Sequence, residues 1–316
     1  MRARAGEVFV TNGFQQALDL IARVLLAPGD VVAVEDPGYP PPTMLFRSLR
    51  MRVVGIPVDA EGLVVSAIPD GTRLVYVTPS HQYPLGMAMS LARRRQLLAW
   101  AERHDAVIVE DDYDSEFRYA GRPLEPVQSI DESWRVLYVG SFSKTMLPTL
   151  RLGFLVAPPA LIPALRKAKL VTDWHSATPM QEALAQFIDE GRFAAHIRRM
   201  RRLYEGRHER IRSILQDRFD DVLELVPSTA GLHVAALLRP GAGVTDRELV
   251  RSARRRGVEL HLPVSALAVT QAPRQGLLVG YGAIATEDVD RALRRLRDCF
   301  DVALTCGAFR PVLCIS

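Results

Sequence analysis

The sequence predicts an α/β protein, with a large domain built on a mostly parallel central sheet flanked by helices and a smaller α+β C-terminal domain. In the first half, short unbroken apolar runs alternate with longer helical patterns, as in sheets that are buried on both faces. After about residue 160 the pattern changes to long helices followed by short strands. With 316 residues, of which 48% are hydrophobic, the chain can build about two domains with apolar cores. We expect the large domain at 1–190 and the small domain at 191–316.

Two helices are expected between the strands of the first half. Apolar side chains recur at helical spacing from Phe14 to Leu25, and the Ala-Pro-Gly sequence at 27–29 ends that helix. Ser90 can cap a second helix, in which apolar residues recur as far as Ala101. Six expected strands are rich in Val, Ile or Leu and lie at 31–34, 52–56, 74–78, 107–109, 136–139 and 153–156.

The second half is expected to hold more helix than strand. Helical patterns fill 160–190 and 192–216, and further helices at 246–256 and 287–298 are interleaved with short strands near 232–238, 258–262 and 277–281. The arginine-rich stretch at 196–212 has two interpretations, a nucleic-acid patch or the solvated face of a helix. Because Ile197, Met200, Leu203, Tyr204 and Ile211 keep one apolar face through it, we favour the solvated helix.

Composition and charge exclude several classes of protein. The net charge of +4 is small and the two signs are interspersed, so no binding of nucleic acid by this chain alone is expected. No apolar run approaches the ~18 residues of a membrane-spanning helix, and the basic start lacks the apolar segment of a signal peptide, so a cytoplasmic location is expected. Neither a disulfide scaffold nor a metal site is predicted, because the cysteines lack a CxxC pair and crowd into the C-terminus: Cys299, Cys306 and Cys314.

Lysine is rare in this chain, so each lysine is a candidate for a special role. Only Lys144, Lys167 and Lys169 occur, whereas the other 37 basic residues are arginines. Lys144 follows an expected strand in a turn that also holds Ser141 and Ser143, and Arg151 comes seven residues later. Two hydroxyls and a guanidinium around one turn suit a phosphate group, and a lysine partly withdrawn from water there can form a Schiff base.

Three other segments supply groups that fit the same ligand. Asp111 and Tyr113 follow an expected strand, at the sheet edge where open α/β sheets bind ligands, and a carboxylate there can pair with a protonated ring nitrogen. The turn at Gly13 opens a helix whose free N–H groups and dipole favour phosphate by roughly 0.3–1 kcal/mol. Tyr39 follows another strand and can stack on a planar ligand. These groups together match the needs of pyridoxal 5′-phosphate (PLP).

The sequence resembles the fold-type-I PLP enzymes of the class I/II aminotransferase group. It most resembles the aminotransferase-like domain of MocR-type regulators of the GntR superfamily, in which that domain follows a winged helix–turn–helix. The resemblance implies the PLP-transferase type I fold and covers most of 8–300. Its motifs run in family order: TNGFQQAL (11–18), EDPGYP (35–40), TPSHQYPLG (78–86), EDDYDSEFRY (110–119), SFSKTMLPTLRLG (141–153) and HIRRMRRLY (196–204).

The resemblance also implies a role for each residue of the candidate site. Lys144 is expected to be catalytic, forming the internal aldimine with PLP and then acting as the base. Asp111 is expected to pair with the pyridine nitrogen, although Asp112 stays open as the alternative. Tyr113 is expected to meet the ring hydroxyl. The groups expected to hold the phosphate or the ring are Ser141, Ser143, Arg151, Gly13, Phe14, Gln15 and Tyr39, with plain core aromatics as the alternative for Phe14 and Tyr39.

Two positions depart from the pattern of typical aminotransferases. Tyr83 stands where that group has an asparagine that touches the ring oxygen, and Gln82 or His81 is a candidate substitute. Leu278 stands where many members have the arginine that grips the substrate carboxylate, and Arg274 is the nearest candidate to replace it. PLP binding is therefore better supported than amino-acid turnover.

Two functions of different classes follow from the resemblance. The first is an aminotransferase that moves an amino group between an amino acid or amine and a 2-oxo acid. The second is a PLP-binding sensor domain of a MocR-type regulator, with little or no turnover. A homodimer is expected in either case, because the family places its sites at a two-fold interface and C2 is the commonest closed symmetry. The start of the chain leaves no room for a winged helix–turn–helix or for the helix that usually opens the PLP domain, so a missing N-terminal part is also expected.

Overall fold

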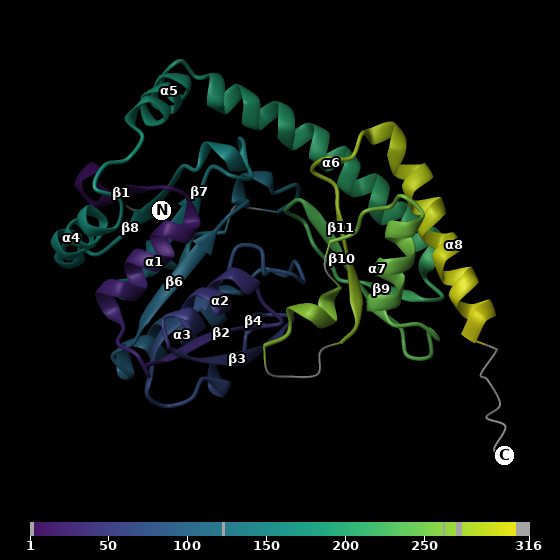
Figure 1. Ribbon diagram of the computed structural model, residues 1–316, viewed down its shortest axis with the longest axis horizontal. Helices are drawn as coiled ribbons and strands as arrows, with labels where there is room; N and C mark the ends of the chain where they lie inside the picture. The colour runs from purple at the N-terminus through teal and green to yellow at the C-terminus, as the bar shows by residue number, and fades with distance from the viewer. Residues whose placement is uncertain (1–2, 122–123, 262, 270–273, 308–316) are drawn as a thin grey trace.

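The large domain is built on a twisted eight-stranded sheet whose central strands run parallel (Figure 1). The computed structural model describes residues 3–121, 124–261, 263–269 and 274–307. The strand order is β1-β8-β7-β6-β5-β2-β3-β4, and β1, β8 and β4 join antiparallel to their neighbours. The strands of this sheet span Val8–Thr11 (β1), Val31–Asp36 (β2), Arg52–Asp59 (β3), Gly62–Leu63 (β4), Thr72–Val77 (β5), Val107–Asp112 (β6), Val136–Ser141 (β7) and Gly153–Val156 (β8). The predicted α/β class and the six predicted strands of this half are confirmed.

Helices cover both faces of the large sheet, which explains its unbroken apolar strands. Helices α1 (Phe14–Leu25), α2 (Pro40–Ser48) and α4 (Ile162–Asp173) pack on one face, with a core that includes Leu18, Phe46 and Leu165. Helix α3 (Leu91–Arg103) packs on the other face through Leu97 and Trp100. All six residues of β2 are buried between these layers.

The structure confirms both predicted helices of the first half and adds one that was missed. Ser90 caps α3 as expected, since its Oγ accepts a hydrogen bond from the N–H of Arg93 at 3.1 Å. Helix α2 is not among the predicted helices, although Pro40 at its first position is a typical start signal.

The predicted helical region 160–190 holds two helices, α4 and α5 (Thr178–Asp189). Helix α4 ends at Asp173, and the φ of 57° at the next residue, Trp174, lies in the left-handed region. Pro179 then suits the first turn of α5, where its missing N–H is not needed. No residue of α5 is buried in the described part of the chain.

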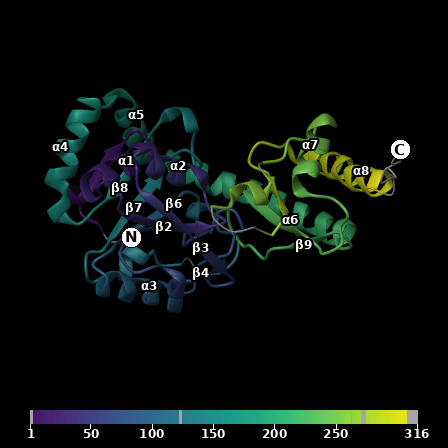
Figure 2. The same ribbon diagram turned by 60° about the horizontal axis from the view of Figure 1, so that its bottom comes forward.

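The small domain packs helices on one antiparallel sheet of three strands. The long helix α6 (Arg192–Phe219) runs from α5 to this domain, and in Figure 2 the domain lies to one side of the large sheet. Tyr204 and Ile211 of α6 are buried there as expected, whereas Leu203 is 38% exposed. The remaining elements are β9 (Leu223–Leu225), β10 (His233–Leu238), α7 (Asp246–Arg255), β11 (Gly276–Gly280) and α8 (Val289–Gly307).

One predicted strand of the small domain is wrong. Residues 258–261 are irregular, and residue 262 lies outside the described residues. Val258 and Leu260 are buried against the core, which explains their apolar pattern. The N–H of Val258 donates to the carbonyl of Ala253 at the end of α7 and not to a neighbouring strand. Burial of this segment therefore comes from packing and not from sheet pairing.

A short antiparallel bridge joins the two domains. Arg118 pairs with Ala230, and the flanking bonds run from Tyr119 N to Thr229 O at 2.8 Å and from Gly231 N to Phe117 O at 2.9 Å. The boundary expected near residues 190 and 191 stays a prediction. None of the helices in the described residues combines the length and apolar character that crossing a membrane requires.

Candidate functional site

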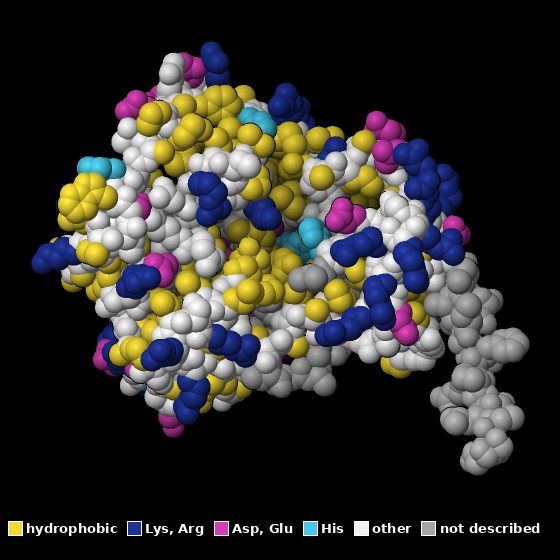
Figure 3. Space-filling model, viewed as in Figure 1, with side chains coloured by type: hydrophobic (Ala, Val, Ile, Leu, Met, Phe, Trp, Pro, Cys, Tyr) yellow, Lys and Arg dark blue, Asp and Glu magenta, His cyan; other side chains and the backbone are white. Residues whose placement is uncertain are grey.

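The predicted site residues gather at the carboxyl edge of the parallel strands. Asp111 lies near the end of β6, Ser141 is the last residue of β7, and Lys144 follows in the turn after it. Because β6 and β7 are parallel neighbours, with Asp111 opposite Val139, the two segments leave the sheet at the same edge. Figure 3 shows histidine side chains near the centre of the visible face, between the two domains.

Asp111 and Asp112 point to opposite faces of the sheet, as successive residues of a strand do. Asp111 is buried and accepts a hydrogen bond from the hydroxyl of Tyr76 at 2.5 Å, on the face covered by α1. Asp112 accepts from Tyr138 at 2.6 Å on the other face. Burial raises the pKa of Asp111 to about 8, and the nearby charge of Asp112 adds to the effect. Asp111 is therefore the acid that shares a face with Gly13 and Tyr39.

The first turn of α1 and Arg151 form a cradle for an anion. Gly13 is the N-cap residue, with φ of 76°, and no side chain caps the amides of Phe14 and Gln15. The guanidinium of Arg151 lies across this turn, since a Cβ at Gly13 would be 2.9 Å from its Nη2. The same Nη2 donates to the carbonyl of Asn12 at 3.0 Å. Helix amides with an adjacent guanidinium are the donors that a phosphate requires.

The serine turn lies beside this cradle. Ser141 pairs with Gly153 of β8, and a Cβ at Gly153 would be 3.1 Å from the Cα of Gly13. The Oγ of Ser141 accepts from the N–H of Ser143 at 3.1 Å, and both serines are partly buried. The close approach of Gly13 and Gly153 thus brings together three segments of the chain, around residues 13, 141 and 151.

Helix α4 holds this cradle in place, which the sequence did not reveal. The carboxylate of Asp173 accepts from the side chains of Asn12 at 3.0 Å, Gln16 at 2.8 Å and Lys169 at 2.5 Å. Burial raises the pKa of Asp173, but hydrogen bonds from Lys169 and Gln16 outweigh it and the net pKa is lowered. Lys169 is thereby engaged in an ion pair with Asp173.

Aromatic rings line the space between the cradle and Asp111. Phe14 lies 6.1 Å from the rings of both Tyr39 and Tyr76, measured between centroids, and Tyr39 lies 5.3 Å from Tyr83. Burial raises the pKa of the half-buried Tyr39, as does the charge of Asp111, whereas Arg151 lowers it. Tyr39 is thus close to both ends of the candidate site. Phe14 also packs on the core of the large domain. It can therefore be both a core aromatic and a residue of the candidate site.

Lys144 is exposed and carries no hydrogen bond or ion pair to any residue that the structure describes. The positive charge of Lys144 acts on two histidines of the small domain. Burial lowers the pKa of His261, and the positive charge of Lys144 lowers it further. Burial likewise lowers the pKa of His233 well below its usual value, and His81 and Lys144 contribute. These two histidines of the small domain thus lie near enough to Lys144 for its charge to act on them.

The side chain of Tyr113 is positioned by His81. Its hydroxyl donates to the carbonyl of His81 at 2.8 Å and lies 3.0 Å from its Nδ1. His81 is buried, with Nδ1 2.9 Å from Asp114 and Nε2 3.3 Å from the hydroxyl of Ser228 in the small domain. Neither suggested substitute for the missing asparagine is free, because Gln82 donates to the carbonyl of Pro37 at 2.9 Å. The His81 network was missed, and no spacing in the sequence signals it.

The position expected to hold a carboxylate-binding arginine is apolar. Leu278 is buried in a cluster on the β11 face toward the large domain, against Ala235, Leu237 and the ring of Tyr83. Arg274 does not replace the arginine, because its guanidinium pairs with Glu224 at 2.9 Å and is 67% exposed. None of the described His, Cys, Asp and Glu residues forms a group of three that could hold a metal ion.

The fold and the site define a family. A model of class I and II aminotransferases matches residues 2–296 of this chain, so the chain belongs to that family. The "Probable rhizopine catabolism regulatory protein MocR" of Rhizobium meliloti is 39% identical over 306 residues, covering 96% of this chain and 61% of that protein. "Aromatic-amino-acid aminotransferase 1" of Thermococcus litoralis is 30% identical over 302 residues, covering 92% of this chain and 72% of that protein.

The solved structures agree on the fold. The kynurenine aminotransferase of Pyrococcus horikoshii, crystallised with PMP, superposes with a TM-score of 0.87 at 28% identity, covering 94% of this chain and 75% of that one. The chain spans about three fifths of the length of the curated regulators that it matches. It is thus an aminotransferase-type domain whose similar proteins include both regulators and enzymes.

Proposed function

We propose that this chain binds PLP covalently at Lys144 and serves as the effector-sensing domain of a MocR-type regulator. One observation carries the cofactor proposal: Lys144, Asp111 and the cradle of Gly13 and Arg151 lie at one edge of the sheet. The donor set fits the group, because the cradle offers helix amides and a guanidinium to a phosphate and Asp111 offers a carboxylate to a ring nitrogen. The 39% identity to the Rhizobium meliloti regulator supports the sensing role.

Each residue has a physical task in this proposal. Asp111, positioned by Tyr76, accepts a hydrogen bond from the ring nitrogen and favours its protonated form. Ser141, Ser143 and Arg151 hold the phosphate together with the amides of Gly13–Gln15. Tyr39 stacks on the ring, and Tyr113 meets the ring hydroxyl. PLP, when bound, supplies a ring that withdraws electrons from the α-carbon of an attached amine.

Lys144 has two tasks, which separate binding from turnover. Its Nζ forms the covalent link, and the same amine is the base that takes and returns the α-carbon proton. A sensor needs only the first task, whereas an aminotransferase needs both. Leu278 favours the sensor, since the apolar wall at this position lacks the guanidinium that would orient a substrate carboxylate.

Amino-group transfer between an amino acid or amine and a 2-oxo acid is the second candidate function. The proposed cofactor residues Lys144, Asp111 and Arg151 favour it, as does the 30% identity to the Thermococcus litoralis aminotransferase. We propose small amines, amino acids and 2-oxo acids as the ligands for both candidate functions, sensing and amino-group transfer. We also propose a homodimer, because helix α5 and the end of α4 leave apolar side chains uncovered.

The first experiment tests the cofactor. Purified protein is incubated with PLP, its visible absorbance is recorded, and borohydride reduction is followed by peptide mapping. We expect one label, on Lys144. A label on Lys167 or Lys169, or a protein that binds no PLP, contradicts the proposed site.

The second experiment separates sensing from turnover. The PLP-loaded protein is mixed with a panel of amino acids and amines while its spectrum is followed. A shifted absorbance that persists supports sensing, whereas conversion to pyridoxamine phosphate that a 2-oxo acid reverses supports transfer. If PLP is bound and no amine changes the spectrum, both functions are wrong.

A further inference from the structure

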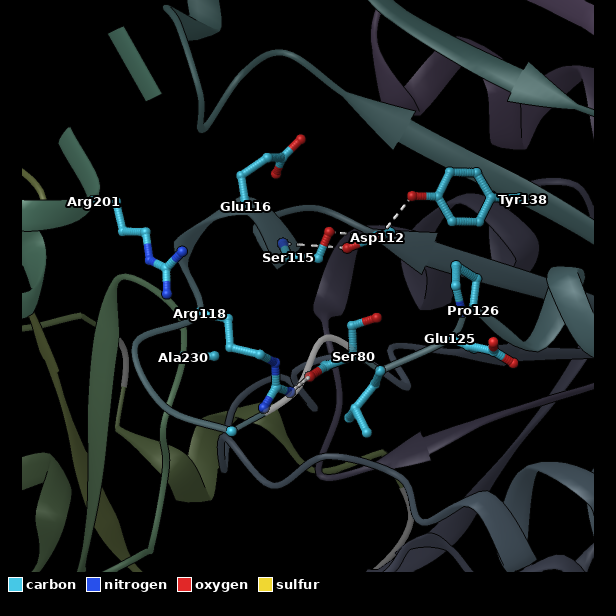
Figure 4. Close-up of a pocket in the computed structure, with 12 residues that line it drawn as sticks. Ser80, Asp112, Ser115, Glu116, Arg118, Glu125, Pro126, Tyr138, Arg201 and Ala230 are labelled. Carbon is cyan, nitrogen blue, oxygen red and sulfur yellow. Dashed lines mark hydrogen bonds between the residues drawn. The ribbon is translucent and has the colours of Figure 1, made fainter. Parts of the chain in front are cut away.

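A cavity opens on the face of the large sheet opposite the candidate cofactor site (Figure 4). Its volume is about 620 Å³, within the range of small-molecule pockets. We call it the Arg118 cavity. The lining residues that matter below are Ser80, Asp112, Ser115, Arg118, Tyr138 and Arg201.

The Arg118 cavity and the cofactor site are separated by the sheet itself. Asp112 lines the cavity, whereas Asp111, one residue earlier in β6, accepts from Tyr76 on the other face. Tyr138 of β7 also lines the cavity and donates to Asp112. A ligand in this cavity therefore contacts none of the residues proposed to hold PLP.

One side of the cavity carries two guanidinium groups that form no ion pair with a carboxylate of the described residues, although the charge of Asp114 acts on Arg118. Among the residues that the structure describes, Arg118 donates to neutral oxygens on Ala120, Thr229 and Ser80, at 3.4–3.5 Å. Arg201 of α6 is exposed and has no hydrogen bond or ion pair within the described ranges. Guanidinium groups bind carboxylates strongly and often through two hydrogen bonds. This side of the cavity is therefore suited to an anionic group.

The rest of the lining is acidic and hydrogen-bonded, with Asp112, Glu116 and Glu125 as its carboxyl groups. Figure 4 shows Asp112, Ser115 and Tyr138 together, away from the guanidinium groups of Arg118 and Arg201. The buried Asp112 accepts through Oδ2 from Ser115 Oγ at 2.8 Å and from Tyr138 at 2.6 Å. Its carboxylate is thus held in a fixed position, where it can receive a donor such as an ammonium group.

We propose that the Arg118 cavity binds a small zwitterion, whose carboxylate contacts Arg118 and Arg201 and whose ammonium group faces Asp112. The cavity spans the domain interface, because Asp112 ends β6, Arg201 belongs to α6 and Arg118 pairs with Ala230 across the domain bridge. An occupant would therefore tie the small domain to the end of β6. The site is independent of the proposed PLP function.

Calorimetry on borohydride-reduced PLP protein tests the proposal, since the reduced cofactor cannot react with an amine. The probes are glycine, β-alanine and 5-aminopentanoate, which space the two charges differently. Pentanoate and pentylamine are the matched ligands with one charge each. We expect at least one zwitterion to bind about tenfold more tightly than either single-charge ligand, a difference of about 1.4 kcal/mol. If the protein takes no PLP, the same titrations on the protein as purified still test the cavity.

Variants assign the binding to this cavity. Arg201→Met and Arg118→Met are each expected to weaken zwitterion binding at least tenfold. Because Arg201 is exposed, its variant leaves the fold intact even if Arg118→Met does not. Arg199→Met, also exposed on α6 but outside the cavity lining, is the control and should bind as the unchanged protein does. The proposal is wrong if no zwitterion binds, or if Arg201→Met binds as tightly as the control.

Discussion

At the scale of single residues, several buried acids share a high proton affinity. Burial raises the pKa of Asp111 to about 8 and the pKa values of Glu35 and Glu110 to about 7. Glu35 accepts from Thr78 and Gln82, and Glu110 from the N–H groups of Val127 and Gln128. These acids fix the loops that leave the sheet edge, at the cost of desolvating carboxyl groups.

This arrangement predicts a pH dependence for the PLP-free protein. A carboxyl group whose pKa is higher in the folded state stabilises fully below its unfolded pKa, near 4, and loses that contribution as pH rises through 7–8. We therefore expect the melting temperature to fall from pH 5.5 to pH 8.5. Asp111→Asn should flatten the slope, because one such group accounts for up to about 1.4 kcal/mol per pH unit. The control is Asp298→Asn on the exposed face of α8. Equal slopes for Asp111→Asn and the unchanged protein would contradict a raised pKa of Asp111 in the folded state.

Lys144→Arg is the second prediction at this scale. The substitution keeps the positive charge, but a guanidinium stays protonated and cannot form the covalent link. We expect the variant to fold normally and to carry no borohydride-fixed label by mass spectrometry. Lys167→Arg, which alters an exposed lysine of α4, should label like the unchanged protein. Full labelling of Lys144→Arg would show that another residue holds the cofactor.

At the scale of elements, the contact between α1 and α4 places the anion cradle. One carboxylate oxygen of Asp173 accepts hydrogen bonds from the side chains of Asn12, Gln16 and Lys169. Asp173→Asn should therefore weaken PLP binding and lower the melting temperature by about 2–6 °C, since it weakens hydrogen bonds to a charged group. Asp189→Asn on α5 serves as the control, because Asp189 is exposed. If PLP affinity is the same in both variants, this contact does not position the cradle.

The elements also show what a sequence can and cannot predict. The parallel strands and α1 were predictable because their apolar periodicity depends only on which face is buried. The irregular segment at 258–261 was not, because Val258 and Leu260 owe their apolar pattern to packing against the core of the small domain and not to strand pairing. The site residues were predicted from motifs at strand ends. The hydrogen bonds of His81 to Asp114 and Ser228 were missed, since they join residues that lie 33 and 147 positions apart in the chain.

At the scale of the whole molecule, an uncovered apolar surface runs from α4 to α5. Val171 is 84% exposed and Trp174 is 69% exposed, and no described residue covers them. We expect a homodimer, with a mass by light scattering of twice 35.1 kDa. Val171→Glu should shift it toward monomer, whereas Met44→Glu, at an exposed methionine of α2, should not. A monomer that binds PLP fully would rule out an interface required for the site.

A substitution at Gly231 is expected to disturb the candidate site indirectly. Its carbonyl accepts hydrogen bonds from the hydroxyls of Tyr119 and Tyr281, each at 2.6 Å, and its φ is 89°. A Cβ there would lie 1.9 Å from the ring of His81, which in turn holds Tyr113. In a genetic screen for cells that no longer respond to the effector, alleles at codon 231 should therefore appear beside those at codon 144. Such alleles would mimic lost ligand contacts although the glycine touches no proposed ligand.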